Sequence, residues 1–149
     1  MEYEYSFEVN SFNKYIDYCR RHKYTLVSQD KETRIIFRKE DKTIARITIK
    51  DNGNEIHKYL DFKEDKLSDE VLIERRESKK LEFENDDEVL SILDFLGYRE
   101  DNQLVRNRTV YTKKNVKFEL DEYIEPSKSL VVAIEGNKKE VDIVYNEIK

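Results

Sequence analysis

Cysteine, proline and glycine are scarce in this 149-residue chain, which contains one, one and three of them respectively. Because Cys19 stands alone, the chain can form neither an intramolecular disulfide nor a cysteine zinc cluster. The sequence also lacks a phosphate-binding glycine loop, a nucleophile elbow and an HExxH motif. These absences exclude the activities that depend on those motifs.

Basic residues are also outnumbered by acidic ones: the chain has 28 Lys and Arg and 33 Asp and Glu, which give a formal net charge of −5. Such a chain has no overall positive field that would attract a nucleic acid backbone, although this net charge does not exclude a locally basic interior. No apolar run is long enough to span a bilayer or to form the apolar segment of a signal peptide. We therefore expect a cytoplasmic protein that binds neither a nucleic acid duplex nor a membrane.

Aromatic residues are plentiful, with ten tyrosines and seven phenylalanines, although 41% of the residues are charged. Disordered chains are poor in aromatic and β-branched residues, so this composition predicts a packed structure. No linker or low-complexity stretch divides the chain. We expect one domain over residues 1–149, a length that can bury a sizeable core.

The order of predicted elements repeats once along the chain. We expect strands over residues 2–9, 24–28, 33–38, 43–50, 57–63, 71–84, 104–112, 116–123 and 130–135, and helices starting after residues 11, 85 and 137. Asn85 and Asn137 are each followed three residues later by a glutamate, which is typical of a helix start. Strand, helix and several strands thus occur twice, and a helix follows. This order predicts an α+β fold: an antiparallel β-barrel or tunnel of about eight strands, with about three flanking helices and a two-fold duplication.

Charged residues alternate with apolar ones in several of these strands. In the first strand Glu2 and Glu4 share one face, because alternate side chains of a strand lie on opposite sides. Later strands have the same pattern: Arg46 with Lys50, Arg75 with Glu77 and Lys79, Arg106 with Arg108, and Lys117 with Glu119 and Asp121. Two interpretations fit. The charged faces are either the solvated side of an antiparallel sheet, or the lumen of a barrel that holds a polyanion together with its metal ion.

The pattern of motifs resembles one known superfamily over essentially the whole chain. The opening Glu-x-Glu of Glu2 and Glu4, the duplication, and the runs Val116–Asp121 and Val132–Gly136 carry the resemblance. They are similar to the CYTH, or triphosphate tunnel metalloenzyme, superfamily. That superfamily includes class IV adenylyl cyclases, thiamine triphosphatases and inorganic tripolyphosphatases.

The resemblance implies a role for nine residues. Glu2, Glu4, Asp121 and Glu135 match its metal ligands for Mg²⁺ or Mn²⁺, while Arg46, Lys63, Arg75, Arg106 and Arg108 match its phosphate-binding cations. Lys63 and Arg108 are the residues we expect to act in catalysis. Four positions depart from the family pattern: Ser6 replaces a lysine, Thr48 an arginine, Lys79 a glutamate and Ala133 a glutamate. One lysine is lost at Ser6 and another is gained at Lys79, which suggests the hypothesis that Lys79 binds phosphate in place of the missing lysine.

The function implied is metal-dependent hydrolysis of a small molecule that carries a triphosphate, such as tripolyphosphate, thiamine triphosphate or a nucleoside triphosphate. Two alternatives stay open. One is a class IV type adenylyl cyclase, and the other is a catalytically degenerate protein that binds a nucleotide or polyphosphate without turnover. Because of the four substituted positions, only an experiment can distinguish the hydrolase, the cyclase and the binding protein. The sequence is also compatible with a homodimer.

Overall fold

The computed structural model describes residues 2–40, 43–67 and 72–149. The elements in these ranges are β1 (Glu2–Val9), α1 (Asn13–Arg21), β2 (Thr25–Arg38), β3 (Thr43–Asp51), β4 (Ile56–Leu67), β5 (Leu72–Glu77), β6 (Leu81–Glu82), α2 (Asp86–Phe95), β7 (Arg99–Lys113), β8 (Val116–Glu125), β9 (Ser129–Gly136) and α3 (Lys138–Ile148).

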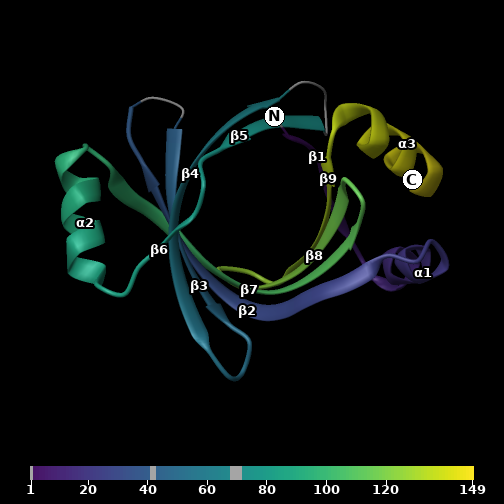
Figure 1. Ribbon diagram of the computed structural model, residues 1–149, viewed down its shortest axis with the longest axis horizontal. Coiled ribbons are helices and arrows are strands. Elements are labelled where there is room, and N and C mark those ends of the chain that lie inside the picture. The colour runs from purple at the N-terminus through teal and green to yellow at the C-terminus, as the bar shows by residue number, and fades with distance from the viewer. Residues whose placement is uncertain (1, 41–42, 68–71) are drawn as a thin grey trace.

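Eight antiparallel strands form a closed ring in the order β3-β2-β7-β8-β9-β1-β5-β4 (Figure 1). The ring closes where β4 pairs with β3, in a register that runs from Thr43 opposite Glu64 to Asp51 opposite Ile56. The two-residue strand β6 pairs with β4 outside the ring. The expected α+β barrel is therefore confirmed, and its closure turns alternate side chains of every strand into a lumen.

The expected two-fold duplication is visible in the strand pairing. If β1, β2, β3 and β4 are exchanged for β5, β7, β8 and β9, the pairs β2–β3 and β3–β4 become β7–β8 and β8–β9. The pair β1–β9 likewise becomes β5–β4, and β1–β5 and β2–β7 map onto themselves. The two halves thus join across β1–β5 and β2–β7 to complete one barrel.

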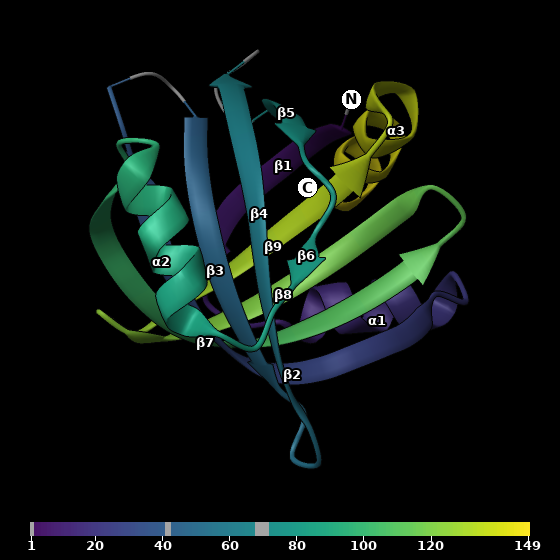
Figure 2. The same ribbon diagram turned by 60° about the vertical axis from the view of Figure 1, so that its left-hand side comes forward.

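The helices lie on the outer side of the barrel wall (Figure 2). The hydrophobic cores lie between the helices and the wall. Beneath α1 and α3, the buried residues of one cluster include Tyr5, Phe118 and Ile134. Beneath α2, Ala45 and Leu93 belong to a second cluster. The apolar faces of the strands therefore point outward, which leaves the charged faces to the lumen and excludes the solvated-sheet interpretation. None of the helices in the described ranges is long and apolar enough to cross a membrane.

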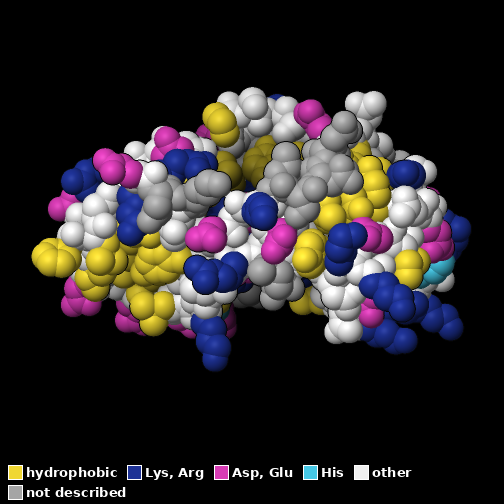
Figure 3. Space-filling view, turned by 90° about the horizontal axis from the view of Figure 1, so that it is seen from above, with side chains coloured by type: hydrophobic (Ala, Val, Ile, Leu, Met, Phe, Trp, Pro, Cys, Tyr) yellow, Lys and Arg dark blue, Asp and Glu magenta, His cyan; other side chains and the backbone are white. Residues whose placement is uncertain are grey.

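Helix α2 packs on the barrel with only part of its apolar surface. Val89 and Leu93 are buried against the wall. Figure 3 shows hydrophobic side chains gathered at the end of the molecule formed by α2, where Leu90, Ile92, Phe95 and Leu96 are exposed. This apolar surface lies outside the barrel, away from the lumen.

The helix starts follow the expected capping chemistry in two of three cases. The Asn85 and Asn137 side chains accept hydrogen bonds from the backbone N–H groups of Glu88 and Glu140, at 3.2 and 2.9 Å. Helix α1 begins differently, because Phe12 occupies the N-cap and Ser11 Oγ accepts from the Asn13 N–H.

One expected strand, over residues 71–84, is interrupted; Val71 lies outside the described residues. Strand β5 ends at Glu77, and the chain resumes as β6 at Leu81. Between them, Ser78 exchanges hydrogen bonds of 2.9 Å with the backbone of Phe62: its N–H donates to the carbonyl and its Oγ accepts from the N–H. Because residues 78–80 are not extended strand, the alternation of side chains does not continue from Glu77 to Lys79.

Candidate functional site

A cavity of about 200 Å³ lies inside the barrel and is lined mainly by charged side chains. Eight cations and five carboxylates face it: Arg34, Arg46, Lys63, Arg75, Lys80, Arg106, Arg108 and Lys117, with Glu4, Glu77, Glu119, Asp121 and Glu135. Three more carboxylates, Glu32, Asp61 and Asp65, contact these cations without lining the cavity. The lining thus has an excess of positive charge, in a protein whose net charge is negative.

Eight of the ten residues expected at the site line this one cavity. They are Glu4, Arg46, Lys63, Arg75, Arg106, Arg108, Asp121 and Glu135. Seven strands of the ring contribute them, from both halves of the chain. Strand closure therefore brings together residues that are up to 131 positions apart in the numbering of the chain.

The other two expected residues, Glu2 and Lys79, do not belong to the lining. Glu2 lies at the start of β1 on the same face as Glu4, and its charge acts on Lys117. Lys79 and Lys80 are both exposed, but Lys80 belongs to the cavity lining and Lys79 does not. The reason is the break after Glu77, which shifts the side chain that points inward by one residue. The structure thus places Lys80, rather than Lys79, at the cavity, and a phosphate-binding role for either lysine stays a prediction.

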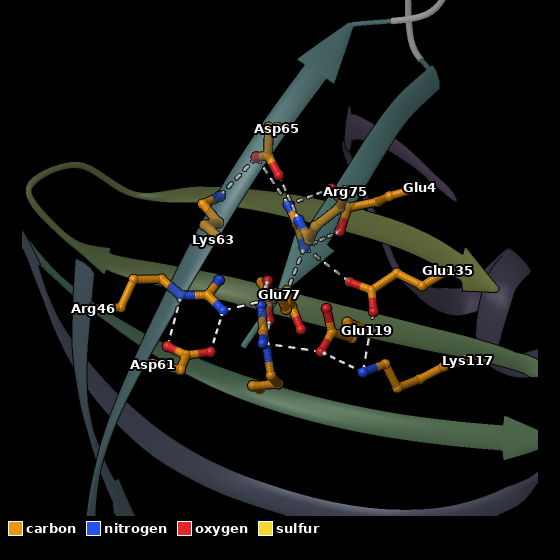
Figure 4. A network of polar contacts seen from close by, with 12 residues as sticks. Glu4, Arg46, Asp61, Lys63, Asp65, Arg75, Glu77, Lys117, Glu119 and Glu135 are labelled. Atoms are coloured by element: carbon orange, nitrogen blue, oxygen red, sulfur yellow. Dashed lines mark hydrogen bonds and ion pairs between the residues drawn. The ribbon is translucent and has the colours of Figure 1, made fainter. Parts of the chain in front are cut away.

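Three buried glutamates from neighbouring strands form a carboxylate triad, comprising Glu4 on β1, Glu119 on β8 and Glu135 on β9 (Figure 4). Each offers an oxygen atom, and these oxygens lie within 4.8 Å of one another. Glu119 was not among the expected ligands, although the alternation of β8 had placed it on the inward face between Lys117 and Asp121.

The charges around the triad shift the pKa values of Glu119 and Glu135 in opposite directions. Burial alone would raise the pKa of Glu119, but Arg108, whose Nη1 is 2.9 Å away, holds it well below its usual range. Burial and the adjacent charge of Glu119 raise the pKa of Glu135 well above its usual range. Clustered carboxylate oxygens are the donors that Mg²⁺ and Mn²⁺ prefer, and a cation would relieve their repulsion. The residues present therefore fit such a metal.

Asp121, expected to bind the metal, is instead held in a bidentate pair with Arg108. Its carboxylate oxygens accept from Arg108 Nε and Nη2 at 2.7 and 2.8 Å. Arg106 Nη1 is a further 3.7 Å from the same carboxylate. In this arrangement Asp121 orients an arginine of the cavity, because paired N–H···O bonds define the plane of a guanidinium.

The other cations are also held by carboxylates around the wall. Arg46 makes a bidentate pair with Asp61, at 3.0 and 2.5 Å. Arg75 donates to both oxygens of Glu4, at 3.1 and 3.3 Å. Lys63 lies 2.9 Å from Asp65, but burial and the charge of Arg75 lower the pKa of its amine. The lumen is therefore preorganised by ion pairs, most of them shielded from water.

Glu32 lies beneath the arginines and is almost fully buried, at 1% exposure. Its Oε1 accepts from Arg106 Nε and Nη2 at 3.1 and 2.9 Å. Arg34 and Lys50 approach to 3.9 and 3.7 Å, and Arg108 to 3.9 Å. Burial alone would raise the pKa of Glu32, but Arg108, Arg106, Arg34 and Lys50 together lower it from 4.5 to about 2.

This shift predicts an acid-sensitive contribution to stability. Because the pKa of Glu32 is lower in the folded state, its stabilisation is present above pH 4.5 and is lost as the pH falls toward 2. The shift corresponds to about 3 kcal/mol. Urea unfolding at a series of pH values checks this: the loss of stability below pH 4.5 should be clearly smaller in Glu32→Gln than in the wild-type protein. Parallel pH profiles would contradict it.

The fold and its lining define a class: a closed antiparallel tunnel with a charged lumen. No protein-family model matches the sequence, and no curated protein is similar to it. Solved structures do match. The PH1012 protein of Pyrococcus horikoshii has a TM-score of 0.78 at 20% identity, over 99% of this chain and 87% of that one.

Two further structures show the range of proteins with this fold. A proposed adenylyl cyclase from Hippeastrum, described as having a dominant triphosphatase activity, has a TM-score of 0.67 at 16% identity, over 99% of this chain and 85% of that one. A chain of the Schizosaccharomyces pombe Mediator head module has a TM-score of 0.65 at 7% identity, over 100% and 93%. The fold expected from the resemblance to the CYTH superfamily is thus confirmed. The fold occurs both in a protein described as a triphosphatase and in a chain of the Mediator head module, so activity has to be argued from the lumen.

Proposed function

We propose that the tunnel binds the triphosphate group of a small molecule together with Mg²⁺ or Mn²⁺ and hydrolyses it. The observation that carries the proposal is one buried lumen with a carboxylate triad on one wall and arginines and lysines on the others. A triphosphate with its metal ion has the complementary charges: the metal needs carboxylate oxygens, and the phosphate oxygens need guanidinium and ammonium groups.

The carboxylates and the cations of the lumen have different roles in this proposal. Glu4, Glu119 and Glu135 would hold the metal, which would neutralise charge that develops on the phosphate oxygens during the reaction. Arg46, Lys63, Arg75, Arg106 and Arg108 would bind those oxygens, as the resemblance implies. Asp121 would keep the Arg108 guanidinium in its plane, rather than bind the metal itself.

In the hydrolysis, a water oxygen forms a bond to the terminal phosphorus, and the bond from that phosphorus to the bridging oxygen breaks. The remaining diphosphate leaves with the electron pair. Lys63 is the candidate to accept the proton of the attacking water, because burial and Arg75 lower the pKa of its amine. Its side chain lines the cavity and is 17% exposed.

Lys63→Met is therefore expected to reduce kcat for tripolyphosphate by about 100-fold or more, the scale of a lost acid–base catalyst, while KM changes much less. Steady-state rates of phosphate release measure both constants. Lys66→Met is the matched control, since Lys66 is exposed on the same strand and outside the cavity. An unchanged kcat, or a loss confined to KM, would contradict this role.

A substrate panel tests the function itself. The protein is incubated with tripolyphosphate, thiamine triphosphate or ATP, in the presence of Mg²⁺ or Mn²⁺. Release of orthophosphate supports the hydrolase, which is also the activity described for the Hippeastrum neighbour. Pyrophosphate with a cyclic nucleotide would identify a cyclase. No binding of any triphosphate would overturn the proposal.

Binding without turnover is the second candidate, and one observation favours it. Ser6 and Ala133 face the lumen as direct cross-strand partners, and Ala133 is also paired with Glu119. Both are small and uncharged at positions where the superfamily pattern has charged residues. Thermal stabilisation by tripolyphosphate and Mg²⁺ without phosphate release would support this candidate.

A further inference from the structure

Arg34, on β2, differs from the other arginines of the cavity in its partners. Its side chain lines the cavity and is only 11% exposed. Its Nε donates to Thr48 Oγ1 at 3.1 Å, and the nearest carboxylate oxygen, on Glu32, is 3.9 Å from Nη2. Within the described part of the chain, the other arginines that line the cavity each have a carboxylate oxygen at 3.2 Å or closer. Arg34 is therefore a buried guanidinium held by a neutral partner.

The surroundings of Arg34 are predominantly cationic. Arg46 lies on the neighbouring strand β3, and Arg106 and Arg108 lie on β7. Burial and these three guanidiniums lower the pKa of Arg34 to about 9. Glu32 compensates only part of this charge, because its Oε1 already accepts two hydrogen bonds from Arg106. Arg46, Arg106 and Arg108 each have a carboxylate at hydrogen-bond distance. Among the described residues, Arg34 has none, so its positive charge is the one on this side of the lumen that lacks such a partner.

Lys80 adds to this excess. It lines the same cavity, and burial and the charge of Lys50 lower the pKa of its amine, to which Arg34 also contributes. Neither Arg34 nor Lys80 makes a hydrogen bond to a carboxylate among the described residues. Lys80 is nevertheless an exposed residue, whereas the Arg34 side chain is buried. A buried cation without a carboxylate partner is costly, and an anion bound at Arg34 would offset that cost.

Thr48 determines where the guanidinium of Arg34 points. The two residues are direct cross-strand partners on β2 and β3. Thr48 is 4% exposed, and its hydroxyl accepts the Nε–H of Arg34, which leaves the Nη groups for another acceptor. In the ring, β2 and β3 stand three or four strands from β1 and β9, which contribute Glu4 and Glu135, whereas β8, which contributes Glu119, is two strands from β2. Arg34 thus lies across the lumen from Glu4 and Glu135.

We propose that Arg34, oriented by Thr48, binds the phosphoryl group of the triphosphate that lies farthest from the metal. This inference rests on the proposed function and specifies the direction in which the triphosphate lies: from the triad on β1, β8 and β9 to the cationic wall on β2 and β3. Such an end group has more negative charge than a bridging phosphoryl group, which suits the side of the lumen where positive charge is in excess.

The test is the binding of tripolyphosphate with Mg²⁺ to Arg34→Met, measured by calorimetry, together with the melting temperature of the ligand-free protein. We expect an affinity loss of about tenfold or more, the scale of a lost charged hydrogen bond. The ligand-free melting temperature should be equal or higher, because one of four clustered guanidiniums is removed. Arg38→Met is the matched control, since Arg38 is on the same strand but 54% exposed and paired with Asp101.

Thr48→Val provides a second, independent variant. It keeps the shape of the side chain and removes only the acceptor for Arg34, so we expect a several-fold loss of affinity with unchanged melting. Diphosphate lacks the third phosphoryl group, so we expect its affinity to differ little between the wild-type protein and Arg34→Met.

The outcomes separate this inference from the proposed function. If the wild-type protein binds tripolyphosphate and Arg34→Met binds it equally well, the inference fails and the proposed function stands. If Arg34→Met unfolds or melts much lower, Arg34 is a structural residue and the inference fails too. If the wild-type protein binds no tripolyphosphate, both fail.

Discussion

Glu119→Gln is expected to weaken Mg²⁺ binding by about 100-fold and to remove metal-supported tripolyphosphate hydrolysis with it. Glu119 is the member of the triad whose pKa lies well below its usual range, because Arg108 and Lys117 outweigh the effect of burial. It therefore contributes a full negative charge at neutral pH. Glutamine keeps the volume of the side chain but removes that charge, so the two remaining glutamates would have to hold the cation.

Calorimetric titration with Mg²⁺ and initial rates of phosphate release measure this effect together. Glu122→Gln is the matched control, because Glu122 lies on the same strand but is exposed, where it accepts from Asn107. A Glu119→Gln protein that retains its Mg²⁺ affinity within about twofold would remove the triad from the proposal.

Arg75→Met is expected to lower the free energy of unfolding by about 3–5 kcal/mol, the usual cost when one member of a buried ion pair is removed. Arg75 donates to Glu4 and to Asp65, with Nε only 2.8 Å from Asp65, and Nη1 lies 3.6 Å from Glu135. Without it, Glu4 loses the guanidinium that pairs with it, whereas Asp65 keeps Lys63 and Glu135 keeps Lys117. A loss of this size is a large part of the stability of a typical domain.

Urea unfolding of Arg75→Met and Arg76→Met separates the buried contribution from a general effect of lost charge. Arg76 is the next residue on β5, is 76% exposed, and pairs with exposed Glu64 at 3.7 Å. Its replacement should change stability by no more than about 0.5 kcal/mol. Mg²⁺ should restore part of the stability of Arg75→Met, because the cation would neutralise the triad. Equal effects of the two substitutions would contradict the assignment.

Much of the site could be predicted because side chains of a strand alternate with period two. The alternation alone placed Glu4 and Arg46 on charged faces, and the resemblance to the CYTH superfamily suggested roles for them. Eight of the ten expected residues lie in one cavity for this reason. The starts of α2 and α3 at Asn85 and Asn137 were likewise determined locally, by side chains that bond to the backbone three residues ahead.

Residues that depend on neighbours in space could not be found this way. Arg34 is in a predicted strand, but its significance arises from its cross-strand partner Thr48 and from the guanidiniums around it. Glu119 was on the correct face, yet only the adjacency of β8, β9 and β1 brings it to Glu4 and Glu135. Lys80 replaces Lys79 because Ser78 bonds to Phe62, a contact between segments far apart in the chain.

By itself, then, the sequence determined which side chains share a face of each strand, where two of the helices begin, and that the order of elements is duplicated. The tertiary structure decided whether the charged faces meet water or one another. The physical reason is that alternation is a property of a single strand, whereas an inside exists only once β4 pairs with β3 and closes the ring. That closure turns the acidic face of β1, which could have been solvated, toward the lumen, where Glu4 belongs to a buried carboxylate triad.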